Sequence, residues 1–153
     1  MANSFTQIYL HIVFSVAYRN ALISDKFKDD LYKYISGGIK NQGHHVIAIG
    51  GTADHIHILI RYNVTQNLPQ LIQSLKVQST KWINENKLSR FRFAWQNGYG
   101  AFSYSQSQVD VVTNYILNQK EHHKKVSFIE EYRKLLDLYH IDFNSNYIFC
   151  EPE

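Results

Sequence analysis

The stretch "ADHIHILIRY", residues 53–62, alternates its side chains in the way that predicts a β-strand with two unlike faces. On a strand, residues two apart point to the same side. His55 and His57 therefore share one face, about 7 Å apart along the chain. Ile56 and Ile58 share the other face. We expect the isoleucines to anchor this strand in a hydrophobic core and the two imidazoles to face one site.

Two other histidine pairs in the chain do not converge in this way. His44 and His45 are adjacent on a predicted strand, so their side chains point to opposite faces. His122 and His123 are adjacent in a predicted helical region, where neighbours diverge by about 100°. We therefore do not expect His122 or His123 to bind a metal, although both could meet a nucleic acid.

Hydrophobic spacing outward from residues 53–62 predicts the order β-α-β-β-α-β, followed by a further strand and C-terminal helices. This is the ferredoxin-like pattern of an α+β fold. Such a sheet is antiparallel, with helices on one face and the other face free for a ligand or a second subunit. The predicted strands are 5–16, 44–50, 54–62 and 93–102, the last with a hairpin turn at Asn97-Gly98; the predicted helices are 25–42, 68–83, 106–120 and 128–139.

The composition is that of an ordinary globular protein. The 153 residues fit a single domain, 1–153, and the net charge of +3 is compatible with a polyanionic partner without requiring one. The single cysteine, Cys150, excludes an intramolecular disulfide and favours a reducing compartment. Neither a signal peptide nor a membrane span is recognisable, so we expect a cytoplasmic protein without membrane contact.

The pair His55 and His57 could bind one divalent cation from a shared strand face. The alternative is that both are surface residues or ordinary hydrogen-bonding partners. Two ligands also make an incomplete site, and a third must come from elsewhere in the chain. The sequence has no HExxH and no paired-cysteine pattern, which argues against a zinc protease or a zinc finger.

Tyr115 and Gln119 supply a second candidate group. They are four residues apart in the predicted helix 106–120, so they lie on one side of it, next to the stripe formed by Val112 and Ile116. The default role of such a tyrosine is the edge of a core. The amide on the same helix side and the histidine pair elsewhere distinguish Tyr115 from the other tyrosines.

With these residues the chain resembles the single-tyrosine HUH transposases, small enzymes of insertion sequences of the IS-two-hundred type. "DHIHIL" at 54–59 resembles the HUH motif (histidine, bulky hydrophobic, histidine), and "YILNQ" at 115–119 resembles the tyrosine motif. The ordered set of similar segments is more specific than either motif alone. The other segments are "HIVFS" (11–15), "AIGGTADHIHILI" (48–60), "LIQSLKVQSTKWI" (71–83), "FAWQNGYGAFSYSQSQVDVVTNYILNQKEHHKK" (93–125) and "SFIEEYRKLL" (127–136).

The resemblance implies a role for each candidate residue. His55 and His57 match the HUH metal ligands, Gln119 matches the glutamine that completes the site, and Tyr115 matches the nucleophile. It further implies Mg²⁺ or Mn²⁺ as cofactor and no nucleotide cofactor. The implied substrate is single-stranded DNA with hairpin ends, cut and rejoined through a 5′-phosphotyrosine intermediate. The implied assembly is a homodimer in which the tyrosine helix of one subunit can serve the HUH site of the other.

Two other functions remain open at this point. One is a domesticated relative that acts on repeated palindromes, and the other is a non-catalytic ferredoxin-like module whose aromatic residues stack on bases. The histidine pair together with Tyr115 favours an enzyme, and the absence of an obvious extra DNA-binding tail favours an element's own transposase. Seven cations are candidates for phosphate contacts, although each could equally be a solvated surface charge: Lys76, Lys81, Arg90, Arg92, Lys120, Lys124 and Lys125.

Overall fold

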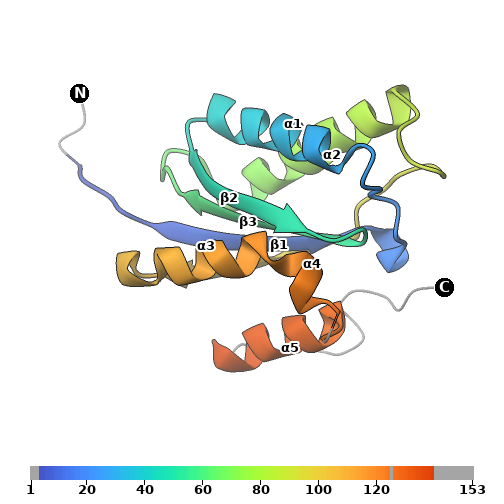
Figure 1. Cartoon of the computed structure of the whole chain (residues 1–153). Coiled ribbons are helices and arrows are strands. Elements are labelled where there is room, and N and C mark those ends of the chain that lie inside the picture. The colour runs from blue at the N-terminus through green and yellow to red at the C-terminus, as the bar shows by residue number, and fades with distance from the viewer. Residues whose placement is uncertain (1–3, 125, 140–153) are drawn as a thin grey trace.

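The computed structural model describes residues 4–124 and 126–139, and within them an antiparallel sheet lies between two layers of helices (Figure 1). The sheet has four strands in the order β2-β3-β1-β4. The chain order β1-α1-β2-β3-α2-β4 confirms the α+β, ferredoxin-like prediction. The strands are β1 (Tyr9–Ser15), β2 (His45–Gly51), β3 (His55–Arg61) and β4 (Gly100–Tyr104).

The predicted helices 25–42, 68–83 and 128–139 are all found, with small shifts in their bounds. None that the structure describes combines the length and apolarity that a membrane span requires. In α2, the side chain of Asn67 accepts a hydrogen bond from the backbone of Gln70 and so caps the first turn, next to Pro69. The bounds are α1 (Lys28–Asn41), α2 (Leu68–Glu85), α3 (Val109–Leu117), α4 (Gln119–His122) and α5 (Phe128–Leu138), with short 3₁₀ turns η1 (Ala17–Arg19) and η2 (Gln106–Gln108).

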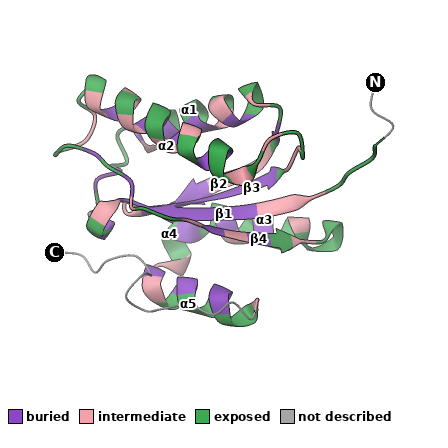
Figure 2. Ribbon diagram, turned by 180° about the vertical axis from the view of Figure 1, so that it is seen from behind, coloured by how far each residue is buried: buried purple, intermediate pink, exposed green. Residues whose placement is uncertain are grey.

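One face of the sheet is aliphatic and packs against α1 and α2. The alternate residues of β1 and β3 that point this way are fully buried apart from Leu10, which is partly buried, and this fits the predicted strand pattern. They meet the apolar stripes of the two helices and form the larger core (Figure 2). The strand residues are Ile12, Phe14, Ile56, Ile58 and Ile60, and the helix residues include Leu31, Ile35, Ile39, Leu71 and Leu75.

The other face of the sheet is covered by α3, α4 and α5, so the expectation of a free face is wrong. Ala48 and Leu59 pack against Val112 and Ile116 of α3. A second cluster joins β1 and β4 to α5 through Val13, Phe102, Phe128, Tyr132, Leu135 and Leu136. The three layers in Figure 1 follow from this second set of contacts.

The further strand with its hairpin at Asn97-Gly98 is not formed among the described residues. Trp95 makes only an isolated bridge with Val16, and β4 begins at Gly100. The indole of Trp95 instead donates a hydrogen bond to Ser79 on α2, at 2.8 Å. Side chains of α2 therefore hold this segment against the core in place of a paired strand.

The predicted helix 106–120 is interrupted. The segment begins with η2, α3 ends at Leu117, and Asn118 has φ −99° and ψ 20° before α4 begins at Gln119. The side-chain amide of Gln119 still donates to the carbonyl of Tyr115, at 3.3 Å. The break turns the chain toward α5 while Tyr115 and Gln119 stay together.

Candidate active site

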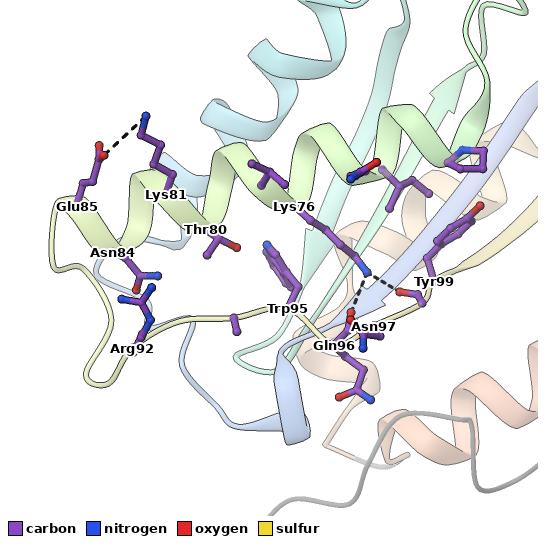
Figure 3. A pocket seen from close by; sticks show the side chains of 16 residues that line it. Lys76, Thr80, Lys81, Asn84, Glu85, Arg92, Trp95, Gln96, Asn97 and Tyr99 are labelled. Atoms are coloured by element: carbon purple, nitrogen blue, oxygen red, sulfur yellow. Dashed lines mark hydrogen bonds and ion pairs between the residues drawn. The ribbon is translucent and has the colours of Figure 1, made fainter.

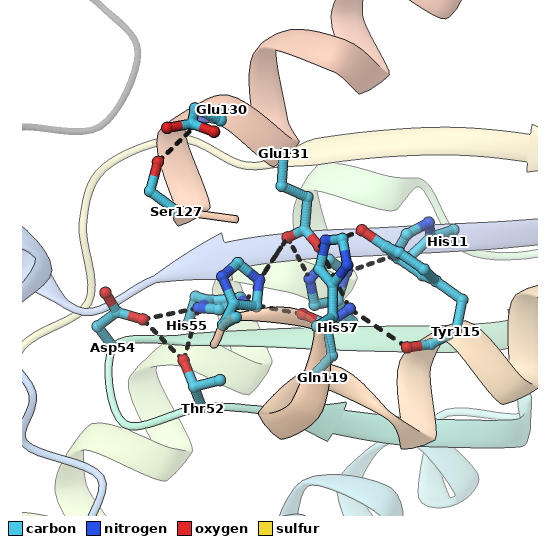
Figure 4. A network of polar contacts seen from close by, with 12 residues as sticks. His11, Thr52, Asp54, His55, His57, Tyr115, Gln119, Ser127, Glu130 and Glu131 are labelled. Carbon is cyan, nitrogen blue, oxygen red and sulfur yellow. Dashed lines mark hydrogen bonds and ion pairs between the residues drawn. The ribbon is translucent and has the colours of Figure 1, made fainter. Parts of the chain in front are cut away.

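The two histidines of β3 lie fully buried beneath α3 and α5 and point at a carboxylate from α5 (Figure 4). The Oε1 atom of Glu131 lies 2.9 Å from His57 Nε2 and 3.7 Å from His55 Nε2. His123 Nε2 lies 3.2 Å from the same oxygen. One ligand atom from each of these four residues falls within 4.8 Å of the other three, and the group could hold a metal ion.

The orientation of the His55 ring is fixed by hydrogen bonds at Nδ1, the nitrogen that points away from Glu131. Its Nδ1 lies 2.7 Å from Oδ1 of Asp54 and 2.9 Å from the hydroxyl of Thr52. Burial alone would raise the pKa of Asp54, but the hydrogen bond and the charge of His55 hold that pKa below its ordinary value. An ionised carboxylate that holds Nδ1–H leaves the Nε2 lone pair free for a cation, as is usual for metal-binding histidines.

His57 is fixed by a third histidine, His11 of β1. His57 Nδ1 lies 2.7 Å from His11 Nε2, and the two rings stack with centroids 4.9 Å apart. Burial lowers the pKa of His57 to about 4, although the hydrogen bond to Glu131 and its charge act in the opposite direction. His57 is therefore neutral at pH 7, which is the form in which imidazole binds a metal.

Tyr115 and Gln119 reach the same centre from the helical side. The hydroxyl of Tyr115 donates to Oε2 of Glu131, and its ring centroid lies 5.8 Å from that of His57. Gln119 is buried, with Oε1 at 3.1 Å from His55 Nε2 and its amide nitrogen at 3.2 Å from Glu131 Oε2. The structure thus brings together all four residues that the sequence singled out.

Glu131 is the carboxylate of this four-residue group. Burial alone would raise the pKa of Glu131, but the surrounding imidazoles and the hydroxyl of Tyr115 hold it well below its ordinary value. Burial and then the charge of Glu131 raise the pKa of Tyr115 above its ordinary value. The hydroxyl is therefore protonated at neutral pH in this arrangement, with its proton directed at the carboxylate.

A cavity of about 540 Å³ between α3 and α5 leads to Tyr115. Its lining is mostly apolar side chains, with Tyr115, His122 and Glu131 at one side and Lys134 among the remaining residues. The nucleophile candidate therefore borders a space that a flat ring could enter, whereas the histidines behind it are closed off from solvent.

Three residues of the site were not predicted as site residues from the sequence. His123 was expected not to bind metal, but the breaks after Leu117 and His122 bring its ring into the group. His11 lies on the same face of β1 as the site, which strand alternation indicates. Glu131 occupies a position in the apolar stripe of α5, between Phe128 and Tyr132, where a buried charge signals a partner.

The cations predicted to contact phosphate lie on different sides of the sheet. Lys76, Lys81 and Arg92 line a hollow of about 890 Å³ beside α2 (Figure 3). The ammonium of Lys76 is already engaged, donating to the carbonyls of Gln96 at 2.8 Å and Gly98 at 2.6 Å. The remaining positions are as follows: Arg90 lies over the ring of Phe91, Lys120 is exposed on α4, Lys124 pairs with Glu121 at 2.9 Å, and Lys125 lies outside the described residues.

Comparison with known proteins agrees with this fold. The family model described as "Transposase IS200 like" matches residues 4–119, and the chain belongs to this family of transposases. The resemblance read from the two motifs is thereby confirmed. His123 and Glu131 lie beyond the matched residues. None of the curated protein sequences compared with the chain matches it.

Two solved structures show the same fold. A candidate transposase from Deinococcus radiodurans R1 is similar with a TM-score of 0.62 and 18% identity, over 78% of this chain and 95% of that one. A REP-associated tyrosine transposase bound to a REP hairpin is similar with a TM-score of 0.60 and 12% identity, over 82% of this chain and 74% of that one. At these identities the likeness establishes the fold.

Proposed function

We propose that this transposase cuts and rejoins single-stranded DNA through a covalent bond to Tyr115, next to a divalent cation bound by His55, His57 and Gln119. The observation that carries the proposal is that the Tyr115 hydroxyl and His57 Nε2 meet at one buried carboxylate. A hydroxyl and a metal-binding group at the same point are what phosphodiester cleavage through tyrosine requires.

The residues present fit a divalent cation. His55 and His57 are buried, and each has a hydrogen-bond partner on Nδ1. The side-chain oxygen of Gln119 lies 3.1 Å from His55 Nε2. A cation bound there supplies charge neutralisation for the phosphate oxygens and for the leaving oxygen. Mg²⁺ or Mn²⁺ is the predicted ion.

In this proposal Tyr115 acts as the nucleophile. Its oxygen forms a bond to phosphorus while the bond from phosphorus to the 3′-oxygen breaks, which gives a 5′-phosphotyrosine and a free 3′-hydroxyl. The phenolic proton leaves through Oε2 of Glu131, to which the hydroxyl already donates, and is passed on to the leaving 3′-oxygen, so that no proton is gained or lost overall. The reverse step, with another 3′-hydroxyl, rejoins the strand without an external energy source.

The substrate is proposed to be an unpaired strand beside a hairpin. Tyr115 lines the cavity between α3 and α5, and in this proposal an unpaired strand enters that cavity to bring the phosphate to the hydroxyl. The similar structure with a bound REP hairpin supports a hairpin as the feature that is recognised. We further propose that the protein acts in the cytoplasm as a homodimer whose two sites handle the two ends of an element.

A role in processing dispersed palindromes is the second candidate. It is favoured by the similarity to the REP-associated transposase, whose TM-score of 0.60 is close to the 0.62 of the Deinococcus transposase. The two functions differ in the DNA: hairpins close to both ends of the gene indicate a mobile element, whereas many scattered copies indicate palindrome processing. The third possibility, base stacking on an open sheet face, loses support because helices cover both faces.

The test uses single-stranded oligonucleotides from the DNA that flanks the gene, with Mn²⁺, resolved on a denaturing gel. Wild-type protein is expected to form a covalent adduct, and Tyr115→Phe none. Tyr34→Phe is the matched control, because Tyr34 lies on α1 and stacks on Trp82, on the far side of the sheet. An adduct that persists in Tyr115→Phe removes this residue as the nucleophile.

A further inference from the structure

Helix α5 inserts a carboxylate into the histidine centre that the family's own motifs do not account for. The Glu131 side chain is 2% exposed, and its two oxygens divide between two sets of partners. Oε1 faces the Nε2 atoms of His55, His57 and His123. Oε2 accepts from Tyr115 and Gln119 (Figure 4) and lies 3.1 Å from His122 Nε2. A buried carboxylate surrounded by imidazole rings is costly unless a cation or protons lie between them.

The spacing of the donor atoms is that of a metal coordination shell. Metal–nitrogen bonds of about 2.1 Å place neighbouring ligands about 3.0 Å apart in an octahedron and about 3.4 Å apart in a tetrahedron. From Glu131 Oε1 the Nε2 atoms of His57, His123 and His55 lie at 2.9, 3.2 and 3.7 Å. A small closure of the group around one ion therefore satisfies all four donors.

The position of His123 adds an independent observation. Its Nε2 atom is buried and lies 3.2 Å from Glu131 Oε1 without forming a hydrogen bond of regular geometry. The ring packs edge-on against His55 with centroids 4.5 Å apart, so the two imidazoles are held next to each other. A buried ring nitrogen that faces a carboxylate without a regular hydrogen bond can bind, through its lone pair, a cation that lies between the two groups.

We propose that α5 and the turn before it complete the metal centre, with His123 and Glu131 binding the same cation as His55 and His57. This rests on the proposed function, since it assumes that a divalent cation is held there. His55, His57 and Gln119 lie within residues 4–119, which the family model matches. The two additional ligands, His123 and Glu131, lie beyond them. The same carboxylate then ties the cation, through Oε1, to the nucleophile, through Oε2.

The donor set also sharpens the choice of ion. Three imidazoles, one amide oxygen and one carboxylate suit Mn²⁺, Co²⁺ or Zn²⁺, whereas Mg²⁺ favours oxygen ligands and retains water. The structure therefore favours Mn²⁺ over Mg²⁺ at this site. We expect wild-type protein to bind Mn²⁺ at least about tenfold more tightly than Mg²⁺.

The experiment is a calorimetric titration of metal-free full-length protein with Mn²⁺ and with Mg²⁺. Glu131→Gln and His123→Ala are each expected to weaken Mn²⁺ binding by at least about tenfold. Glu130→Gln and His45→Ala are matched controls, since neither residue belongs to the metal-binding group and His45 is exposed at the start of β2. Both controls are expected to bind Mn²⁺ like wild type.

The possible failures are distinguishable. Unchanged Mn²⁺ affinity in Glu131→Gln, together with loss in His57→Ala, overturns the inference and leaves the proposed function in place. A wild-type protein that does not bind Mn²⁺ overturns both. If circular dichroism shows that the variants have lost helix content, a second measurement uses wild-type protein with ¹⁵N-labelled histidine and electron–nuclear double resonance. Coupling of Mn²⁺ to three histidines supports the inference, and coupling to only two overturns it.

Discussion

On the central strands β1 and β3, alternate residues point to the two faces of the sheet, and the two sets differ in polarity. Toward α1 and α2 the side chains are Ile12, Phe14, Ile56, Ile58 and Ile60. Toward α3 and α5 they include His11, Ser15, His55 and His57, all fully buried. A shift of one residue in register would exchange these two sets. The strand alternation therefore fixes the core and the site together.

The comparison shows what each face contributes. The aliphatic face needs only shape and volume, and local periodicity is sufficient to specify it. The histidine face buries polar rings, so every ring needs a partner, and those partners come from β1, α4 and α5. The first face holds the strands rigid, and the second uses that rigidity to place a cation site beside a tyrosine.

The largest effect is expected from His57→Ala, which tests whether the histidine face carries metal binding and DNA cleavage. Removal of one oriented ligand on the histidine face should abolish measurable Mn²⁺ binding and reduce the yield of covalent DNA adduct about a thousandfold. Ile58→Val is the matched control on the opposite face and should leave both unchanged. The measurements are calorimetry and adduct yield on a denaturing gel; wild-type adduct yield in His57→Ala would refute the assignment of this face.

The next effect is on stability and comes from the aliphatic face. Ile58 is fully buried among the α1 and α2 side chains, so Ile58→Ala should lower the free energy of unfolding by about 2–5 kcal/mol. Urea denaturation measures it. The fraction that remains folded should still bind Mn²⁺. Loss of Mn²⁺ binding without loss of stability would mean that the two faces do not divide these roles.

A smaller effect is expected where α2 holds the segment before β4. Ser79 accepts the hydrogen bond of the buried Trp95 indole at 2.8 Å, so Ser79→Ala should cost about 1–3 kcal/mol of stability. Adduct yield per folded molecule should not change, because this contact lies on the far side of the sheet from Tyr115. A double-mutant cycle with Trp95→Phe isolates the contact; no coupling between the two changes would remove it as a stabilising interaction.

The smallest effect is a gain. Gly37 lies within α1, and an added Cβ would have no neighbour within 4 Å, so Gly37→Ala should raise stability by about 0.5–1 kcal/mol. Gly50→Ala is the contrast, because its Cβ would lie 2.2 Å from the carbonyl oxygen of Ile116 in α3. Thermal unfolding should move up for the first and down for the second; equal shifts would mean that α3 does not depend on close approach to β2.

Local patterns predicted the parts of the molecule that depend on local rules. The alternation around His55 and His57 predicted β3, and the spacing of Tyr115 and Gln119 predicted that they stay together. The hairpin at Asn97-Gly98 failed because contacts from α2, through Lys76 and Ser79, hold the segment elsewhere. Such contacts join residues about twenty positions apart, and no local propensity encodes them.

The site was predictable to the same extent. The residues within the two motifs were found, whereas Glu131 was not, because it meets His57 across a separation of 74 residues. Its one local signal is a charge in the apolar stripe of α5. His123 was excluded because adjacent residues on a helix diverge by about 100°, an argument that concerns only a pair with His122. In the structure His123 instead joins His55, His57 and Glu131, which that argument does not address.

The most direct measurement is peptide mapping by mass spectrometry of the protein after reaction with flanking single-stranded DNA and Mn²⁺, followed by nuclease digestion. The account predicts one modified peptide that carries a nucleotide 5′-phosphate on Tyr115. A nucleotide on any other tyrosine, or an adduct that forms equally well after the divalent cation has been chelated, would contradict it.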